Sequence, residues 1–364
     1  MFSSYNNWNG ASPRDSEFEQ KQEPFPWRRF FARSLDLTIY STIFEAIAAL
    51  GFRINILETG FIYNVISTVL TLVFMILAEG FLLSRFGTTF GKWIFGIKVT
   101  TKDGHKITFT EGIERTYGVI RYGLGFQIPF YDLYRQYKSY QDCRDCWQLE
   151  WDRDFQITLQ DKKKLRIVLF ITVNATLILL SLGVYQLSTL PVHRGELTVE
   201  EFCENYNAYA RFFKFESDIL LPDGTWQQKT ETDSYTMDLY EYDNPDFEFV
   251  VEDGILKGVG FEIHETNEDK NNPYVHSYYG KEILLATLSY LRAQDNYNPF
   301  HDKSASLIEN MIENLDMDHS FRAYDVDVDY NIDVTGYYST GFGYWPEEDK
   351  DGSIRITFKI QKVN

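Results

Sequence analysis

The sequence predicts an α-helical membrane bundle of three to four transmembrane helices, followed by an α+β soluble domain. Two apolar runs, residues 61–84 and 167–187, are each long enough to cross a bilayer, and the second contains no charged side chain. Residues 195–364 contain 13 Lys and Arg against 35 Asp and Glu, a net charge of −22, whereas residues 1–194 carry +4 of the total of −18. A mildly basic, apolar first half and an acidic second half therefore indicate separate domains.

The first expected helix, residues 37–52, is short for a membrane span and contains Glu45. It reaches spanning length if it begins at Phe30, which brings Arg33 and Asp36 to the membrane entrance. Opposite charges three residues apart lie on one helical face. Because ionisable side chains are costly in hydrocarbon, this pair is either a structural anchor for helix packing or part of an intramembrane site.

The loop after the apolar run 61–84 is strongly basic and is predicted to be cytoplasmic, because Lys and Arg accumulate on that side of membrane proteins. Its basic residues are Arg85, Lys92, Lys98, Lys102, Lys106 and Arg115. The N-terminus is then cytoplasmic too, and residues 51–60 form a short external loop. Residues 97–101 and 106–110 are expected to pair as a hairpin, since the Asp-Gly sequence between them favours a tight turn.

Residues 115–135 leave open whether the chain crosses the membrane fully at this point. The segment is largely apolar, but it contains Arg121, Pro129 and Asp132. A full crossing would put the basic residues of 135–166 outside, against the charge rule, so we expect a broken or re-entrant element that returns to the cytoplasm. The next helix would then place the C-terminal domain outside the cytoplasm of a multi-pass cell-membrane protein.

The chain is thus expected to have four parts: a disordered tail (1–24), a membrane domain (25–160), a final transmembrane helix with a basic cytoplasmic flank (161–190) and an acidic α+β domain (195–364). Within the last part, Thr198 and Glu201 have the spacing of a capping box that begins a helix. Apolar periodicity and turn residues predict helices at 198–213, 281–294 and 304–315, a turn at 221–225, and strands at 235–242, 247–251, 255–264, 324–338 and 354–360.

Two motifs of the membrane domain resemble those of the RDD family of small integral membrane proteins, which is named for an arginine and two aspartates. The first motif carries Arg29, Arg33 and Asp36, and the second, residues 86–99, looks like that family's glycine-lysine loop after the second span. The resemblance covers residues 25–160. It implies an integral membrane protein, for which ion or solute transport has been suggested.

The same resemblance indicates candidate site residues. Residues 149–154 are similar to the family's late aspartate-containing segment, so Asp152 is the candidate for the second aspartate. The predicted transport or structural charged site consists of Arg33, Asp36, Glu79 and Asp152. A transport role would also involve Glu45, Arg121 and Asp132.

The loop motif consists of Gly87, Gly91, Lys92 and Gly96, with Phe90 where the family commonly has proline. A phosphate-binding loop would need four residues between the glycines and Ser or Thr after the lysine, but Gly87 and Gly91 are separated by three residues and Trp93 follows. We instead expect the glycines to allow close backbone packing, with Lys92 and Trp93 at the level of the lipid head groups.

No residue pattern indicates catalysis, and we expect no enzyme activity, metal or cofactor. Cys143 and Cys146 have the spacing of half a zinc site, but no second Cys or His pair accompanies them, so we interpret them as incidental thiols. His264 lacks the second histidine of a metalloprotease helix. Residues 325–333 alternate Asp or Asn with apolar residues, which indicates a strand with a solvated acidic face; a calcium site is the alternative.

The expected function is binding or sensing by a membrane protein. Its partners are the lipid bilayer and a protein or ligand that contacts the C-terminal domain. The strong negative charge of that domain argues against nucleic-acid binding. The alternative is a proton- or sodium-coupled transporter of ions or small solutes that uses the intramembrane Arg, Asp and Glu residues. The ligand and the oligomeric state stay open.

Overall fold

The computed structural model describes residues 25–161, 163–215, 218–227, 244–266, 279–340, 343–347 and 350–363. These residues form two compact units: residues 25–52 and 59–182 make up the first, and residues 53–58 and 183–363 the second. The predicted N-terminal tail and the predicted strand at 235–242 lie outside the described residues.

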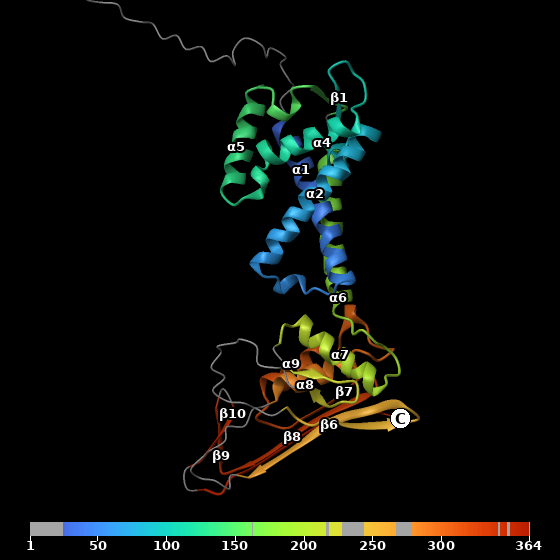
Figure 1. Ribbon diagram of the computed structural model, residues 1–364, viewed down its shortest axis with the longest axis vertical. Helices are drawn as coiled ribbons and strands as arrows, with labels where there is room; N and C mark the ends of the chain where they lie inside the picture. The colour runs from blue at the N-terminus through green and yellow to red at the C-terminus, as the bar shows by residue number, and fades with distance from the viewer. Residues whose placement is uncertain are drawn as a thin grey trace, which may run out of the picture. The chain divides into compact units, whose positions relative to one another are not determined.

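Three long helices organise the first unit: α1 (Pro26–Ala46), α2 (Phe61–Phe86) and α6 (Leu165–Ser188) (Figure 1). A π-helical turn, Ile47–Gly51, extends α1. Among the described residues, α2 and α6 are the two helices long and apolar enough to cross a membrane. The ionisable residues of α1 make it less apolar than these two, although its length is comparable.

Apolar side chains are exposed along much of α6. The large exposed ones are Leu165, Ile167, Val168, Leu169, Ile171, Ile178, Leu179, Leu180, Leu182 and Leu187. An exposed apolar surface of this extent marks contact with lipid or with a partner protein. The helix therefore has the surface expected of a lipid-facing span.

The predicted hairpin at 97–110 is wrong. Strand β1 (Ile97–Thr101) exists, but it pairs antiparallel with β2 (Phe155–Leu159), and Ile97 lies opposite Leu159. The chain does turn at Gly104, whose N–H donates to the Thr101 carbonyl at 3.0 Å. After that turn, Thr108 and Glu111 form a capping box, which begins helix α4 (Phe109–Gly118) where a second strand was expected.

The segment after α4 is broken, in agreement with the sequence. A π-helical turn (Val119–Gly123) and a 3-10 turn (Gly125–Gln127) follow α4, and helix α5 (Tyr131–Arg144) then begins. A 3-10 turn at Glu150–Asp152 leads into β2. Because β2 pairs with β1, residues 102–154 start and end at the same small sheet.

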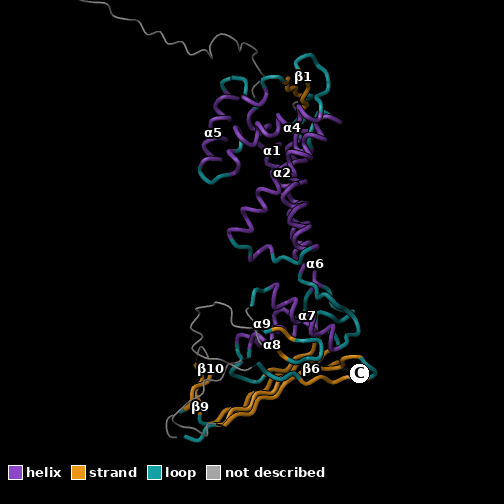
Figure 2. The backbone as a smooth tube through the Cα atoms, in the orientation of Figure 1, coloured by secondary structure: helices purple, strands orange, loops and turns teal. Residues whose placement is uncertain are grey.

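A five-stranded antiparallel sheet forms the centre of the second unit, with the strand order β5-β6-β11-β8-β7. Figure 2 shows the long strands of this unit, in orange, near its helices. The strands of the sheet are β5 (Glu248–Glu252), β6 (Ile255–Thr266), β7 (His319–Ala323), β8 (Val326–Thr335) and β11 (Ser353–Lys362). Its core joins one sheet face to helices α7 (Val199–Phe212), α8 (Gly280–Leu291) and α9 (Ala305–Glu313). The predicted capping box of Thr198 and Glu201 begins α7.

Smaller elements complete this unit. A two-stranded hairpin, β3 (Ile219–Leu220) and β4 (Trp226–Gln227), encloses the predicted turn. The strand predicted at 324–338 is divided at Gly336, which has a φ of 66°, into β8 and β9 (Tyr337–Thr340). Strand β9 pairs with β10 (Gly343–Pro346). Strand β7 was not predicted.

The alternating aspartates of β8 lie as expected on the face opposite the core. Val326, Val328 and Tyr330 are fully buried, whereas Asp327 pairs with Arg322 and Asp329 accepts a hydrogen bond of 2.6 Å from Ser320 Oγ. In the described parts of the chain, no group of three or more His, Cys, Asp or Glu side chains is placed to hold a metal ion.

Candidate functional site

A buried network of charged side chains connects α1 with the rest of the first unit. Arg29, Arg33 and Asp36 are spaced by four and three residues, so they lie along one face of α1. Arg33 forms an ion pair with the fully buried Glu79 of α2. Arg33 and Asp36 thus share a face of α1, as expected, and each binds a partner from a later segment of the chain.

Asp36 holds the turn that begins α3 (Phe90–Ile94) against α1. Its Oδ1 accepts a hydrogen bond of 2.7 Å from the Gly91 N–H, and its Oδ2 accepts one of 2.5 Å from Thr89 Oγ1. The approach of the two segments requires glycine at position 91, because a Cβ atom there would lie 2.0 Å from the Ala32 carbonyl oxygen. Gly91 thus has the close backbone contact expected of the loop motif.

Two other glycines of the motif, Gly87 and Gly96, allow a left-handed backbone conformation. Gly87 ends α2 with a φ of 70°, and its N–H donates to the Leu83 carbonyl at 2.9 Å. Gly96 has a φ of 71° just before β1. Both values lie in the left-handed region that favours glycine.

Lys92 is buried, which corrects the prediction that it lies at the level of the lipid head groups. Its Nζ donates to Glu79 Oε2 at 3.2 Å and to Thr89 Oγ1 at 3.1 Å, and lies 3.6 Å from Asp36 Oδ2. Burial, with the nearby Arg33 guanidinium, lowers the pKa of Lys92 to about 8 against the opposing effect of the two carboxylates. Trp93, by contrast, is exposed.

Asp152 joins two arginines at the other end of the network. It is fully buried and binds Arg29 of α1, while Arg115 of α4 donates to its Oδ1 from Nε at 3.0 Å and from Nη2 at 2.7 Å. Burial would raise the pKa of Asp152, but the two guanidinium groups outweigh that effect and hold it below its usual value.

Arg115 was missed as a site residue and was predicted only as part of a basic loop. A helical pattern over residues 109–118 could have indicated it, because Arg115 shares the buried face of α4 with Gly112 and Thr116.

Three ionisable residues predicted for a transport role lie outside this charge network. Glu45 lies at the far end of α1, Arg121 stacks on its neighbour Tyr122, and Asp132 accepts a hydrogen bond from the Leu133 N–H.

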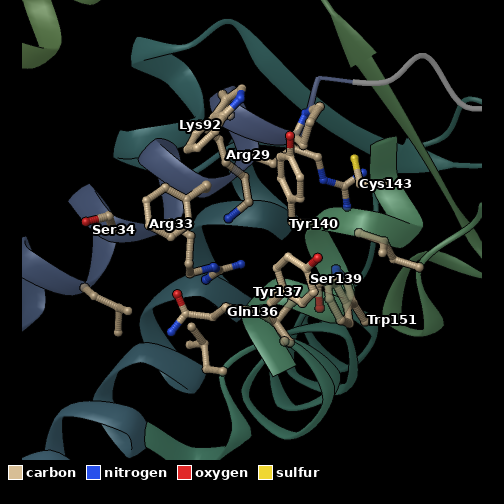
Figure 3. Close-up of a pocket in the computed structure, with 18 of the residues that line it drawn as sticks. Arg29, Arg33, Ser34, Lys92, Gln136, Tyr137, Ser139, Tyr140, Cys143 and Trp151 are labelled. Carbon is tan, nitrogen blue, oxygen red and sulfur yellow. The ribbon is translucent and has the colours of Figure 1, made fainter. Parts of the chain in front are cut away.

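A cavity of about 700 Å³ lies beside the network and is partly open to the surface (Figure 3). Among the described residues that line it, the charged ones are Arg29, Arg33, Lys92 and Arg115, and none is a carboxylate. Figure 3 shows Arg33 of α1 and Tyr137 and Tyr140 of α5 around the same space. The apolar part of the wall includes Leu37, Val119, Leu124, Leu133, Trp151 and Ile157.

One donor of this network has no acceptor. Arg115 is only 4% exposed, and no hydrogen-bond acceptor among the described residues lies within reach of its Nη1. The cations Arg29, Arg33, Lys92 and Arg115 share the carboxylates of Asp36, Glu79 and Asp152. The cavity is therefore electrostatically suited to an anion.

The two thiols of the Cys-x-x-Cys sequence are not joined by a disulfide. Cys143 lies in α5 and lines the cavity, and burial raises the pKa of its thiol. A thiol with a raised pKa is a weak nucleophile and a poor metal ligand at neutral pH.

Two apolar helices long enough to cross a bilayer, together with a buried charge network that joins α1 to one of them, α2, define a helical domain of the membrane type. Residues 24–185 match the family model described as RDD family, and this part of the chain is an RDD-family domain. The match reaches into α6 and ends before α7, the first helix of the α+β unit. No curated protein and no solved structure matches the chain.

Proposed function

We propose that this protein is a multi-pass membrane protein that binds an anionic ligand in the cavity beside α1, and that its acidic α+β unit is an extracytoplasmic binding or sensing domain. The observation that carries the proposal is the lining of the cavity, in which every charged side chain is cationic. The function is therefore binding, with the charge network as the binding apparatus.

The energetics of the network support anion binding. A buried charge is costly unless a charge of opposite sign or several hydrogen bonds compensate it. Glu79 and Asp152 each compensate two of the cationic side chains, and Asp36 adds a weaker contact to Lys92. A bound anion would add negative charge beside these cations and accept from Arg115 Nη1.

The pairing of β1 with β2 supports the proposed orientation. Residues 102–154 return to the sheet from which they started, which favours a segment without a net crossing of the membrane. The basic residues around β1 favour the cytoplasmic side for this sheet. Helix α6 follows β2 directly and would then carry the chain out of the cytoplasm.

A second candidate function is a proton- or sodium-coupled transporter of ions or small solutes that uses Arg33, Asp36 and Glu79. The observation in its favour is a pair of fully buried carboxylates, Asp36 and Glu79, beside the amine of Lys92. A transported cation would need carboxylates that face its path, however, and neither carboxylate lines the cavity. If Asp36→Asn abolishes ion flux in proteoliposomes while the protein keeps its abundance and melting temperature, transport replaces binding as the favoured function.

Anion binding can be measured as thermal stabilisation of the full-length protein purified in dodecyl maltoside, because a ligand of the folded state raises its melting temperature. The probes are inorganic phosphate and octyl phosphate, each compared with sodium chloride at equal ionic strength. We expect at least one of them to stabilise the wild type and the exposed control Arg144→Gln, but not Arg115→Gln. The proposal fails if neither probe exceeds chloride.

A further inference from the structure

We infer that the anion bound in this cavity is the head group of an anionic membrane phospholipid, whose acyl chains lie against the apolar wall and continue into the bilayer. The inference rests on the proposed anion binding and names the class of ligand. The geometry that points to it is a cavity lining that combines four cationic side chains with a larger set of apolar and aromatic side chains.

The cationic part suits a phosphate group. Arg115 uses Nε and Nη2 on Asp152, and its Nη1 has no acceptor within the described part of the chain, although the side chain is buried. A buried donor without a partner costs about 1–3 kcal/mol, so an acceptor that reaches Nη1 gains this energy on binding. Phosphate oxygens form strong charge-assisted hydrogen bonds with guanidinium groups.

The apolar part suits an acyl chain. Leu37 of α1 and Val119 of the π-helical turn after α4 both line the cavity, and Trp151 adds a large apolar surface. A ligand that was only a small inorganic anion would leave this surface in contact with water. The volume of about 700 Å³ lies within the range of roughly 300–1,000 Å³ that is usual for sites of small organic ligands.

The rim of the cavity indicates how the ligand enters. Trp27, Phe30, Leu133 and Tyr137 line the cavity and are also largely exposed. Aromatic side chains of this kind gather where a protein meets the interface of a bilayer. A lipid can move into the cavity across such a rim without passing through water, whereas a water-soluble anion would have to cross it.

Retention of lipid by the protein provides the direct test. The full-length protein is reconstituted in nanodiscs with equal amounts of phosphatidylglycerol and phosphatidylcholine, extracted in dodecyl maltoside, and the lipid that stays bound is quantified by mass spectrometry. We expect enrichment of phosphatidylglycerol, and an enrichment about tenfold or more weaker in Arg115→Gln, because a hydrogen bond to a charged group is lost. Equal retention of the two lipids would overturn the inference.

A rim variant covers the case in which Arg115→Gln fails to fold. Leu133→Glu introduces a carboxylate on an exposed lining residue, 63% exposed, and should repel the head group without disturbing the core. Tyr134→Glu is the matched control, since Tyr134 is the next residue of α5, is 57% exposed and is not among the lining residues. The inference requires Leu133→Glu to lose phosphatidylglycerol and Tyr134→Glu to keep it.

The two soluble probes separate this inference from the proposed function. If octyl phosphate raises the melting temperature at far lower concentration than inorganic phosphate, and octyl glucoside does not, both the anionic head and the apolar chain take part in binding. If inorganic phosphate acts as strongly as octyl phosphate, anion binding stands and the lipid inference is overturned. If neither acts, both are overturned.

Discussion

Arg33 of α1 and Glu79 of α2 form an ion pair in the interior of the membrane-type domain, although 46 residues separate them in the chain. Glu79 also accepts from Lys92 and Thr116, so one carboxylate connects α1, α2, α3 and α4. Such a buried carboxylate has its full effect only when all these partners are in place, because low polarity strengthens both the attraction and the cost of a missing partner.

Glu79→Gln should destabilise the protein strongly, because it leaves Arg33 and Lys92 without their shared carboxylate in a buried site. Removal of one partner from a buried ion pair typically costs about 3–5 kcal/mol. The free energy of unfolding, measured by steric trapping in detergent, should decrease by this order. The exposed variant Arg322→Gln, which breaks the pair with Asp327 in the other unit, should leave it unchanged. A similar decrease in the free energy of unfolding in both variants would contradict the view that burial makes the Glu79 ion pairs more important than an exposed pair.

Gly91→Ala should prevent α3 from packing on α1, because the new Cβ atom would overlap the Ala32 carbonyl oxygen. We expect loss of folded protein after detergent extraction, measured by size-exclusion chromatography. Gly60→Ala is the matched control, since nothing lies within 4 Å of a Cβ atom at that position. Normal recovery of both variants would show that the loop can shift away from α1 at low cost.

Anion affinity should fall as the pH rises from 7 to 9, because Lys92, with a pKa of about 8, loses its positive charge over this range. The groups that face it, Asp36, Glu79, Arg33 and Arg115, are those that shift its pKa. Octyl sulfate is the appropriate probe, since its own charge is constant. Lys92→Arg should flatten the pH profile, whereas a wild-type profile that is already flat would contradict the assignment.

The lowered pKa of Lys92 also affects the stability of the ligand-free protein, which should rise with pH where anion affinity falls. The pKa of Lys92 is lower in the folded protein than its ordinary value of 10.5, so the unfolded chain binds more protons between about pH 8 and pH 10.5. The contribution of Lys92 to the free energy of unfolding should therefore rise over this range. The difference between wild type and Lys92→Arg in detergent isolates that contribution.

The orientation can be measured with single cysteines in a background without Cys143, Cys146 and Cys203. Glu309→Cys lies at an exposed position of α9, and Asn7→Cys lies in the N-terminal segment. In intact cells a membrane-impermeant thiol reagent should label only the former. If neither cysteine is labelled until the membrane is opened, the α+β unit is cytoplasmic and the charge rule does not hold for this chain.

The sequence was sufficient where structure depends on neighbouring residues. The apolar runs predicted α2 and α6, because a helix that meets lipid must be apolar along its whole length. Thr198 and Glu201 predicted the start of α7, since a capping box needs only four consecutive residues. The same signature at Thr108 and Glu111 was overlooked, and the Asp-Gly turn led instead to the wrong hairpin.

Only the tertiary structure decided which residues distant along the chain contact each other. Local sequence favours a strand at β1, but the choice of β2 as its partner depends on α4 and α5, which fold between the two strands. Likewise, a lysine in a basic loop is normally exposed, and Lys92 is buried because Asp36 and Glu79 reach it from two helices. The sequence by itself determined which segments are apolar, charged or helical, whereas only the packed structure decided which charges meet and leave a cationic cavity, because these contacts depend on distances that local sequence does not encode.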